Sequence, residues 1–220
     1  MKPRLLFITG SDTDAGKTVL ATLLVRHLRE RGIRVAGLKP ICSGGRDDAR
    51  ELHEAAGKIL PLDAVNPWHC RAPLAPLLAA RREKRRVYLR EVVASIRRVS
   101  REFDCVVVEG AGGLLSPLGE DFNSRDLLCA LGARPLIVCP NRLGAVNQAL
   151  LVLEALPCGL ADRAPVILSA ASADPTSASN VTLLRELLGP QRVQVLPRVN
   201  PAGKLNPRVR AMLAALAFSD

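Results

Sequence analysis

The stretch Ile8–Leu20, ITGSDTDAGKTVL, decides how this chain is expected to fold. An apolar run, Leu5–Thr9, leads into it and an amphipathic run follows it, which predicts a buried strand, a loop from Gly10, and a helix from Lys17. A Gly-Lys-Thr sequence in that setting is typical of a phosphate-binding loop. Backbone N–H groups and the helix N-terminus hold phosphate oxygens, Lys17 reaches the outer phosphates, and the Thr18 hydroxyl meets Mg²⁺.

The loop departs from the usual pattern in length and in charge. Five residues instead of four separate Gly10 from Gly16, and Ser11 stands where the first glycine is expected. The extra residue enlarges the turn without removing a phosphate-binding group. Asp12 and Asp14 would repel phosphate unless a metal or a cationic substrate lay between, so either could face a second, amine-bearing ligand.

Apolar runs recur along the chain, each followed by a stretch with helical periodicity. Continuous apolar strands are buried on both faces, which predicts an α/β fold of three layers, a mostly parallel sheet flanked by helices, in one domain over residues 1–220. The predicted strands are Leu5–Thr9, Val35–Leu38, Cys105–Val108, Pro135–Cys139, Val166–Leu168 and Val193–Leu196. The predicted helices are Lys17–Arg31, Asp47–Gly57, Leu89–Arg101, Ser124–Leu131, Gly144–Leu156, Ser179–Leu188 and Pro207–Ala217. Ile59–Arg86, rich in proline and arginine, is expected to be an ordered, functional excursion with two short elements.

The composition limits the partners. Thirty-one basic against 21 acidic residues give a net charge of +10, yet only 3% of the residues are aromatic, too few for base-stacking platforms. The dense cluster Arg81–Arg86 is interpreted as a solvated helix end or loop. No apolar run of about 18 residues and no cleavage signal occur, so we expect a cytoplasmic protein without nucleic acid or membrane partners. The six cysteines form no CxxC pair and are expected to be buried, reduced thiols.

Polar residues follow the second predicted strand. Lys39 and Ser43 lie at its carboxyl end, where open α/β sheets bind ligands, so both are expected to point into a site. Asp47 and Asp48 open the next helix. One of them is expected to cap that helix and the other to bind Mg²⁺.

A third apolar strand ends in an acid and a glycine turn. Glu109 lies where a second metal ligand is expected beside a phosphate-binding loop. The turn Gly110–Gly113 is expected to present bare backbone N–H groups that bind an anion.

Several separated stretches together resemble the dethiobiotin synthetase family of the P-loop NTPase superfamily. GSDTDAGKT is similar to that family's Gly-Thr-Asp-Thr-Glu/Asp-Val-Gly-Lys-Thr loop, including the additional residue. KPICSG, Asp48-Ala49, NPWHCRAPLAP, VVVEGAGGLLSPL and NRLGAVNQALL match further family stretches in order. The resemblance runs from Phe7 to about Leu151, roughly two thirds of the chain.

The resemblance implies an ATP- and Mg²⁺-dependent cyclo-ligase that joins CO₂ to 7,8-diaminononanoate and closes a ureido ring through a carbamic-phosphoric anhydride. It also implies a homodimer with the site at the interface. The implied catalytic residues are Lys17, Lys39, Thr13 and Ser43, and the implied metal ligands are Thr18, Asp48 and Glu109. The implied nucleotide-binding residues are Asp14, Ala15, Gly16, Lys17, Thr18, Val19, Glu109, Ser169 and Pro197. The implied substrate-binding residues are Lys39, Ser43, Gly110, Ala111, Gly112, Gly113 and, from the other subunit, Leu143, Gly144 and Asn147.

The sequence departs from the family at three places. Ser169 stands where an Asn usually reads adenine, Gln148 stands where a His is expected, and Asp14 replaces a Glu of many relatives. Two alternatives stay open at this point. One is a partitioning-type ATPase switch that binds membranes or DNA, although its additional early loop lysine is replaced here by Ser11-Asp12. The other is a different synthetase of the same superfamily.

Overall fold

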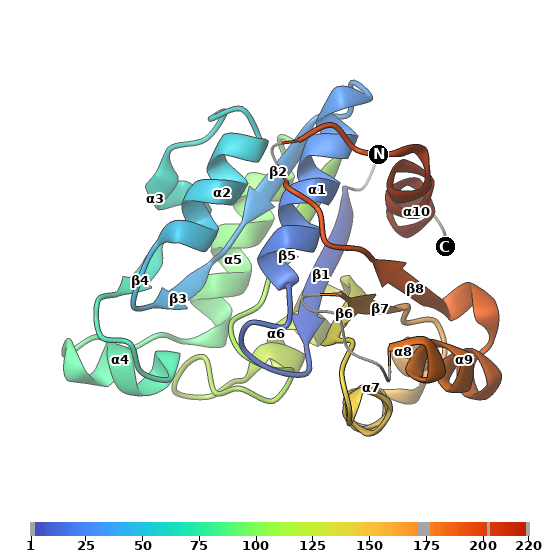
Figure 1. Ribbon diagram of the computed structural model, residues 1–220. Coiled ribbons are helices and arrows are strands. Elements are labelled where there is room, and N and C mark those ends of the chain that lie inside the picture. Colours follow the sequence, from blue (N-terminus) through green and yellow to red (C-terminus); the bar gives the residue numbers. More distant parts are fainter. Residues whose placement is uncertain (1–2, 171–176, 202, 219–220) are drawn as a thin grey trace.

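The computed structural model describes residues 3–170, 177–201 and 203–218 (Figure 1). Its main feature is a sheet of six strands in the order β2-β5-β1-β6-β7-β8, and every neighbouring pair is parallel. The strands are β1 (Arg4–Gly10), β2 (Val35–Leu38), β5 (Cys105–Glu109), β6 (Arg134–Pro140), β7 (Val166–Ser169) and β8 (Val193–Leu196). All six predicted strands are confirmed, and the loop after β1 leaves from the middle of the sheet.

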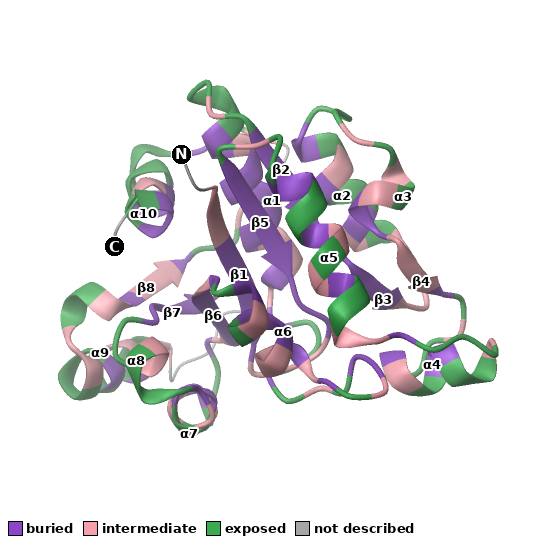
Figure 2. Cartoon of the chain, turned by 180° about the vertical axis from the view of Figure 1, so that it is seen from behind, coloured by how far each residue is buried: buried purple, intermediate pink, exposed green. Residues whose placement is uncertain are grey.

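Helices cover both faces of this sheet, as the apolar strands predict. The face that carries Leu6 and Ile8 packs against α1 (Lys17–Glu30), α2 (Asp47–Ala55) and α10 (Pro207–Phe218). The face that carries Phe7 packs against α5 (Leu89–Ser100), α6 (Ser124–Leu131), α7 (Ala145–Glu154) and α9 (Ser177–Leu188). Figure 2 shows the central strands buried between these layers. The three-layer α/β fold is therefore confirmed.

The excursion between α2 and α5 is ordered and forms a small unit beside the main sheet. It contains α3 (Leu62–Val65), β4 (Trp68–Cys70) and α4 (Pro76–Arg82), and β4 pairs in parallel with β3 (Ile41–Ser43). Short elements of this kind, like α8 (Cys158–Ala161) and a 3₁₀ turn at Pro190–Arg192, lack a hydrophobic period long enough to predict them.

The predicted cap of α2 is wrong. Arg46 occupies the N-cap position, and no side chain in the described part of the chain caps the helix. Asp47 instead pairs with Arg50 at 2.7 Å, while Asp48 pairs with Lys39 at 2.8 Å. Both carboxylates lie in the first turn, where the helix dipole favours negative charge. The carboxylate of Asp48 points toward the carboxyl ends of the strands, where Lys39 lies.

Two expectations about the surface have different outcomes. All six cysteines are free, but Cys129 and Cys158 are exposed, because each lies on the outward side of a short helix. The cluster Arg81–Arg86 forms the end of α4 and the turn after it, and five of its six residues are exposed, which confirms a solvated helix end. Among the described residues, no helix is long and apolar enough to cross a membrane.

The imidazole of His27 makes the stability of the fold depend on pH. His27 lies in the last turn of α1, is 6% exposed, and its Nε2 atom has no hydrogen-bond partner among the described residues. Burial lowers the pKa of His27 below 6.5; Arg31 and Arg210 lower it further, and Glu30 opposes the shift. Between the lowered pKa and 6.5 only the unfolded chain takes up the proton, so stability is lost as the pH falls through this window.

We therefore expect the free energy of unfolding to fall between pH 7 and pH 5.5, by at most about 1.4 kcal/mol per pH unit from this residue. Urea unfolding at both pH values measures the loss. His27→Gln removes the titrating ring and should flatten the pH dependence. An equal pH dependence in the two proteins would contradict the assignment.

Candidate active site

The loop between β1 and α1 wraps around the N-terminus of the helix. Its backbone N–H at Ser11 donates to the carbonyl of Val138 on β6 at 3.1 Å. Asp14 and Gly16 adopt left-handed backbone conformations, with φ of 56° and 96°. At Gly16 a Cβ atom would also lie 3.1 Å from the Cβ of Ser169, so the close approach of β7 to the loop requires glycine here.

Lys17 is enclosed by the loop that precedes it. Its side chain is buried, and Nζ donates to the carbonyl of Asp12 at 2.6 Å. Burial and the nearby charge of Lys39 lower the pKa of Lys17 to about 8. The loop thus folds back over a lysine that carries its charge in a partly dehydrated setting.

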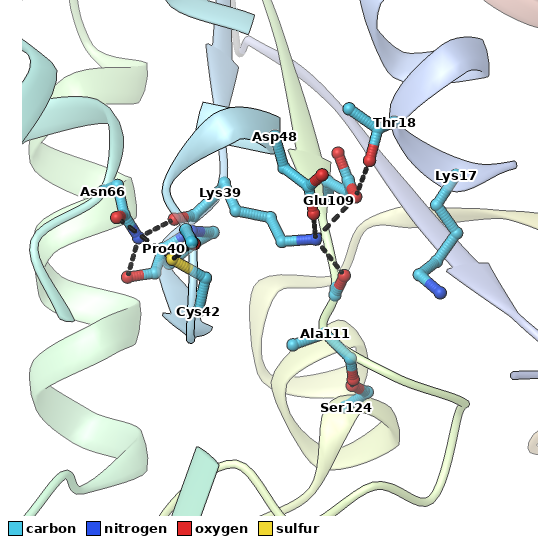
Figure 3. A network of polar contacts seen from close by, with 12 residues as sticks. Lys17, Thr18, Lys39, Pro40, Cys42, Asp48, Asn66, Glu109, Ala111 and Ser124 are labelled. Atoms are coloured by element: carbon cyan, nitrogen blue, oxygen red, sulfur yellow. Dashed lines mark hydrogen bonds and ion pairs between the residues drawn. The ribbon is translucent and has the colours of Figure 1, made fainter. Parts of the chain in front are cut away.

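A second lysine, Lys39 at the carboxyl end of β2, connects an acid at the end of β5 with an acid in the first turn of α2 (Figure 3). Nζ of Lys39 lies 2.6 Å from Oε1 of Glu109 and 2.8 Å from Oδ2 of Asp48, and it donates to the carbonyl of Gly110 at 3.2 Å. The Thr18 hydroxyl donates to the same Glu109 oxygen at 2.8 Å. Segments far apart in the sequence therefore meet at one carboxylate.

The opposite charges of Lys39 and Asp48 each favour the ionised form of the other. Lys39 and Glu109 are 3% and 1% exposed. Burial by itself would lower the pKa of Lys39, but the carboxylates of Glu109 and Asp48 outweigh burial and raise it. Burial opposes ionisation of Asp48 as well, yet the Lys39 ammonium holds the pKa of that carboxyl below its usual range.

These groups border a cavity of about 720 Å³ at the carboxyl edge of the sheet. The phosphate-binding loop, the segment after β2, the excursion and the segment after β5 each contribute part of its wall. The lining residues include Thr13, Asp14, Gly16, Lys17, Thr18, Val19, Lys39, Cys42, Ser43, Asp48, Pro73, Leu74, Ala75, Pro76, Glu109, Ala111, Gly112, Ser116 and Pro117. The cavity is thus charged on the side of the two lysines and largely apolar on the side of the excursion.

The glycine turn after β5 does not offer all the free N–H groups that the sequence predicts. The N–H of Gly110 donates to the carbonyl of Ile8, and that of Gly113 donates to the Ser116 hydroxyl at 2.8 Å. The expectation of bare donors is wrong at these two positions, because the turn uses them to bind β1 and to close on itself. Ala111 and Gly112 still line the cavity.

Eight of the residues implied by the resemblance lie outside the cavity wall. Ala15 is buried beneath the loop, and its carbonyl accepts a 2.7 Å hydrogen bond from the Ser169 hydroxyl. Gly110 and Gly113 lie in the turn described above. The remaining five include Ser169 and surface residues after β6, on α7 and after β8: Leu143, Gly144, Asn147 and Pro197.

Some residues that line the cavity lie within the matched motifs but were not predicted to be site residues. Cys42 lies between Lys39 and Ser43, Pro73–Pro76 belong to the Ala-Pro-Leu-Ala-Pro stretch, and Ser116 and Pro117 belong to the stretch after the glycine turn. Only their place in a matched motif could have identified these residues from the sequence, because an apolar side chain by itself does not indicate a binding site.

The oxygen atoms in the network fit a magnesium ion. Oε2 of Glu109 is buried without a hydrogen-bond partner in the described part of the chain, beside the Thr18 hydroxyl and the Asp48 carboxylate. The described residues hold no group of three or more His, Cys, Asp or Glu suited to a metal. Two carboxylates and a hydroxyl suit Mg²⁺, which usually keeps water and substrate phosphate oxygens as its other ligands.

A parallel sheet with a glycine-lysine-threonine loop after its central strand, and an acid after the neighbouring strand, defines a P-loop nucleotide-binding α/β protein. Residues 4–208 match the family described as an AAA domain. The signal recognition particle receptor FtsY of Elizabethkingia anophelis has the same fold, with a TM-score of 0.57 at 13% identity over 98% of this chain and 65% of that one.

Curated relatives narrow this class. ATP-dependent dethiobiotin synthetases from Anaeromyxobacter sp. and Ralstonia nicotianae are 37% and 34% identical over 95% of this chain, and 96% and 92% of their own lengths. The enzyme of Akkermansia muciniphila is 42% identical over 70% of this chain and 72% of its own. The chain belongs to the ATP-dependent dethiobiotin synthetase family. This membership favours the synthetase interpretation over a partitioning-type switch.

The buried pair of Lys39 and Glu109 predicts a large stability effect. Lys39→Met leaves the Glu109 carboxylate buried without its cation and should lower the free energy of unfolding by about 3–5 kcal/mol. Urea unfolding at pH 7 measures it. Adding Glu109→Gln to the variant should restore much of the loss, because the uncompensated charge is then gone.

Lys58→Met is a matched control, because Lys58 forms an exposed pair with Glu54. It should change stability by less than about 0.5 kcal/mol. Equal losses for Lys39→Met and Lys58→Met would contradict the proposed importance of burial.

Proposed function

We propose that this chain performs the reaction of its family at the cavity described above, joining CO₂ to 7,8-diaminononanoate with ATP to form dethiobiotin, ADP and phosphate. One amine bonds to the carbon of CO₂ and loses a proton, giving a carbamate. A carbamate oxygen takes the γ-phosphoryl group as ADP leaves. The second amine then bonds to the carbonyl carbon and loses a proton, and phosphate leaves as the ring closes.

The observation that carries this proposal is the convergence of two lysines, one hydroxyl and two acids on a single cavity. Phosphoryl transfer needs little covalent help from protein, and it depends mainly on positioning and on neutralising charge. Lys17 enters the cavity from the start of α1 and Lys39 from the end of β2, so a phosphoryl group between them would meet a positive charge from either side. Thr13 and Ser43 line the same cavity and are proposed to contact the carbamate.

The nucleotide phosphates are proposed to lie along the loop residues Asp14–Val19. An arriving phosphate would replace the Asp12 carbonyl as the partner of Lys17. Thr18, Asp48 and Glu109 are proposed to hold Mg²⁺, which when bound neutralises phosphate charge. Lys39 already lies between the two acids, so its ammonium stays next to the metal ligands and to the substrate.

Ser169 and Pro197 are proposed to lie near the base. In the structure the Ser169 hydroxyl is bound to the loop carbonyl of Ala15, and its side chain is buried. A hydroxyl committed in this way offers the base no free donor. Base recognition is therefore proposed to rest on shape and on backbone contacts near β7 and β8.

A homodimer with shared sites is proposed from the residues on and before α7. Leu143, Gly144 and Asn147 lie on the surface, outside the cavity wall of their own subunit. The side chains of Leu143 and Leu151 are 79% and 60% exposed, and Leu115 of the segment after β5 is 53% exposed. Exposed large apolar residues suit a protein interface, and Leu115 and Leu151 line one surface hollow. Such an interface would bring Leu143, Gly144 and Asn147 to the substrate of the partner subunit.

Lys17→Gln tests the mechanism. Phosphate release is measured with ATP, Mg²⁺ and bicarbonate, with and without 7,8-diaminononanoate. The wild-type chain should release phosphate only with the diamine, and Lys17→Gln should lower kcat at least about 100-fold, because the lysine charge serves mainly the transition state.

Lys58→Gln removes an exposed lysine charge that does not line the cavity and should keep wild-type turnover. Phosphate release that does not depend on the diamine would overturn the proposed function. Near-normal turnover of Lys17→Gln would remove Lys17 from the mechanism.

Mixed dimers test the shared site. Lys17→Gln and Asn147→Ala, each impaired alone, should recover about a quarter of wild-type turnover after equal mixing and subunit exchange, since half of the dimers then hold one intact site of two. Turnover is followed by phosphate release. No recovery in verified mixed dimers would contradict a site built from both subunits.

A further inference from the structure

Asn66 is a buried residue that lies behind the cavity wall, and the proposed reaction assigns it no role. It follows α3, is 1% exposed, and does not line the cavity. A fully buried amide must find partners for two donors and an acceptor, or it costs stability. Its partners show what this residue holds in place.

The amide nitrogen of Asn66 binds the backbone that carries Lys39. Nδ2 donates to the Lys39 carbonyl at 2.6 Å and lies 3.5 Å from the Pro40 carbonyl (Figure 3). These carbonyls fall between β2, which ends at Leu38, and β3, which begins at Ile41. The side chain of Asn66 therefore supplies a hydrogen-bond donor to a carbonyl that lies outside both β2 and β3.

The amide oxygen of Asn66 binds the segment that leads into α2. It accepts from Nε of Arg46 at 3.1 Å and from the thiol of Cys42 at 3.2 Å. Arg46 also donates to the Asn66 carbonyl at 3.0 Å and pairs with Asp63 at 2.8 Å. Because Arg46 directly precedes Asp47 and Asp48, this contact fixes the start of the helix that carries Asp48.

The amide nitrogen and the amide oxygen of Asn66 thus connect the segment that carries Lys39 with the segment that leads to Asp48. The side chains of Lys39 and Asp48 both lie at Glu109 (Figure 3). Lys39 and Asp48 come to that acid from β2 and from α2, and nothing in their local sequence sets the distance between those elements. We propose that Asn66 is a positioning residue, which holds Lys39 and Asp48 in register with Glu109 and the transferred phosphoryl group. The inference rests on the proposed function.

The backbone of the excursion supports the same role. The Lys39 N–H donates to the Val65 carbonyl at 3.0 Å, and the Trp68 N–H donates to the Pro40 carbonyl at 3.0 Å. Main-chain bonds therefore clamp Lys39-Pro40 on both sides of the Asn66 side chain. The Asn-Pro-Trp stretch, matched in the sequence without a function, holds the catalytic lysine from behind.

Two variants of Asn66 separate positioning from mere stability. Asn66→Asp keeps the shape and the acceptor for Arg46 but loses the donor to Lys39, and Asn66→Ala loses both sides. Each should lower kcat about 10- to 100-fold, as loss of a supporting contact commonly does, while the Kd of a non-hydrolysable ATP analogue stays within about threefold, since the phosphate-binding loop is untouched. If Asn66→Ala does not fold, Asn66→Asp carries the test.

Asn206→Ala is the matched control, because the Asn206 side chain accepts a hydrogen bond from the Val209 N–H in the first turn of α10 and does not line the cavity. It should lower the Tm without lowering kcat. If the Asn66 variants bind nucleotide and keep kcat within about twofold of the wild type, the proposal is overturned.

A crystal structure of Asn66→Asp gives a readout that needs no activity. The Lys39–Glu109 distance should lengthen from 2.6 Å, or the Lys39 backbone should shift. An unchanged network at that position would overturn the positioning role, even if the wild-type chain shows no diamine-dependent phosphate release. That last result by itself would overturn only the proposed function.

Discussion

The contact between the Lys39 ammonium and the Glu109 carboxylate is the interaction on which the site depends. Both groups are almost fully buried, and their ends lie 2.6 Å apart. A buried charge lowers the stability of the fold unless a partner of opposite sign lies close, so each of the two residues reduces the free-energy penalty of burying the other. The contact joins the strands β2 and β5 at their carboxyl ends, where Thr18 adds its hydroxyl from α1.

The sheet order explains why these groups can meet. β1 lies between β5 and β6, and β2 lies beyond β5, so the phosphate-binding loop, Glu109 and Lys39 leave from consecutive strands. Parallel strands bring their carboxyl ends to one edge, and side chains there face a common space. Asp48 joins them from the first turn of α2 through its ion pair with Lys39.

The excursion gives this site its support. Its short elements contribute Val65, Cys70, Ala79 and Ala80 to the buried core. Asn66 and Arg46 form a continuous set of hydrogen bonds from α3 to the start of α2. Proline residues of the same excursion form the apolar side of the cavity. The hydrogen bonds behind Lys39 and one wall of the cavity thus come from the same segment.

The sequence by itself determined the six apolar strands, the seven long helices and the loop before Lys17, because burial on both faces and helical periodicity are local patterns. Their places at strand ends also brought forward Lys39 and Glu109, and the motif resemblance brought forward Asp48. Only the tertiary structure decided that Asp48 pairs with Lys39 instead of either aspartate capping α2, that the N–H groups of Gly110 and Gly113 are already used, and that Asn66 holds Lys39 from behind. These outcomes depend on distances between segments many residues apart, which no local pattern encodes.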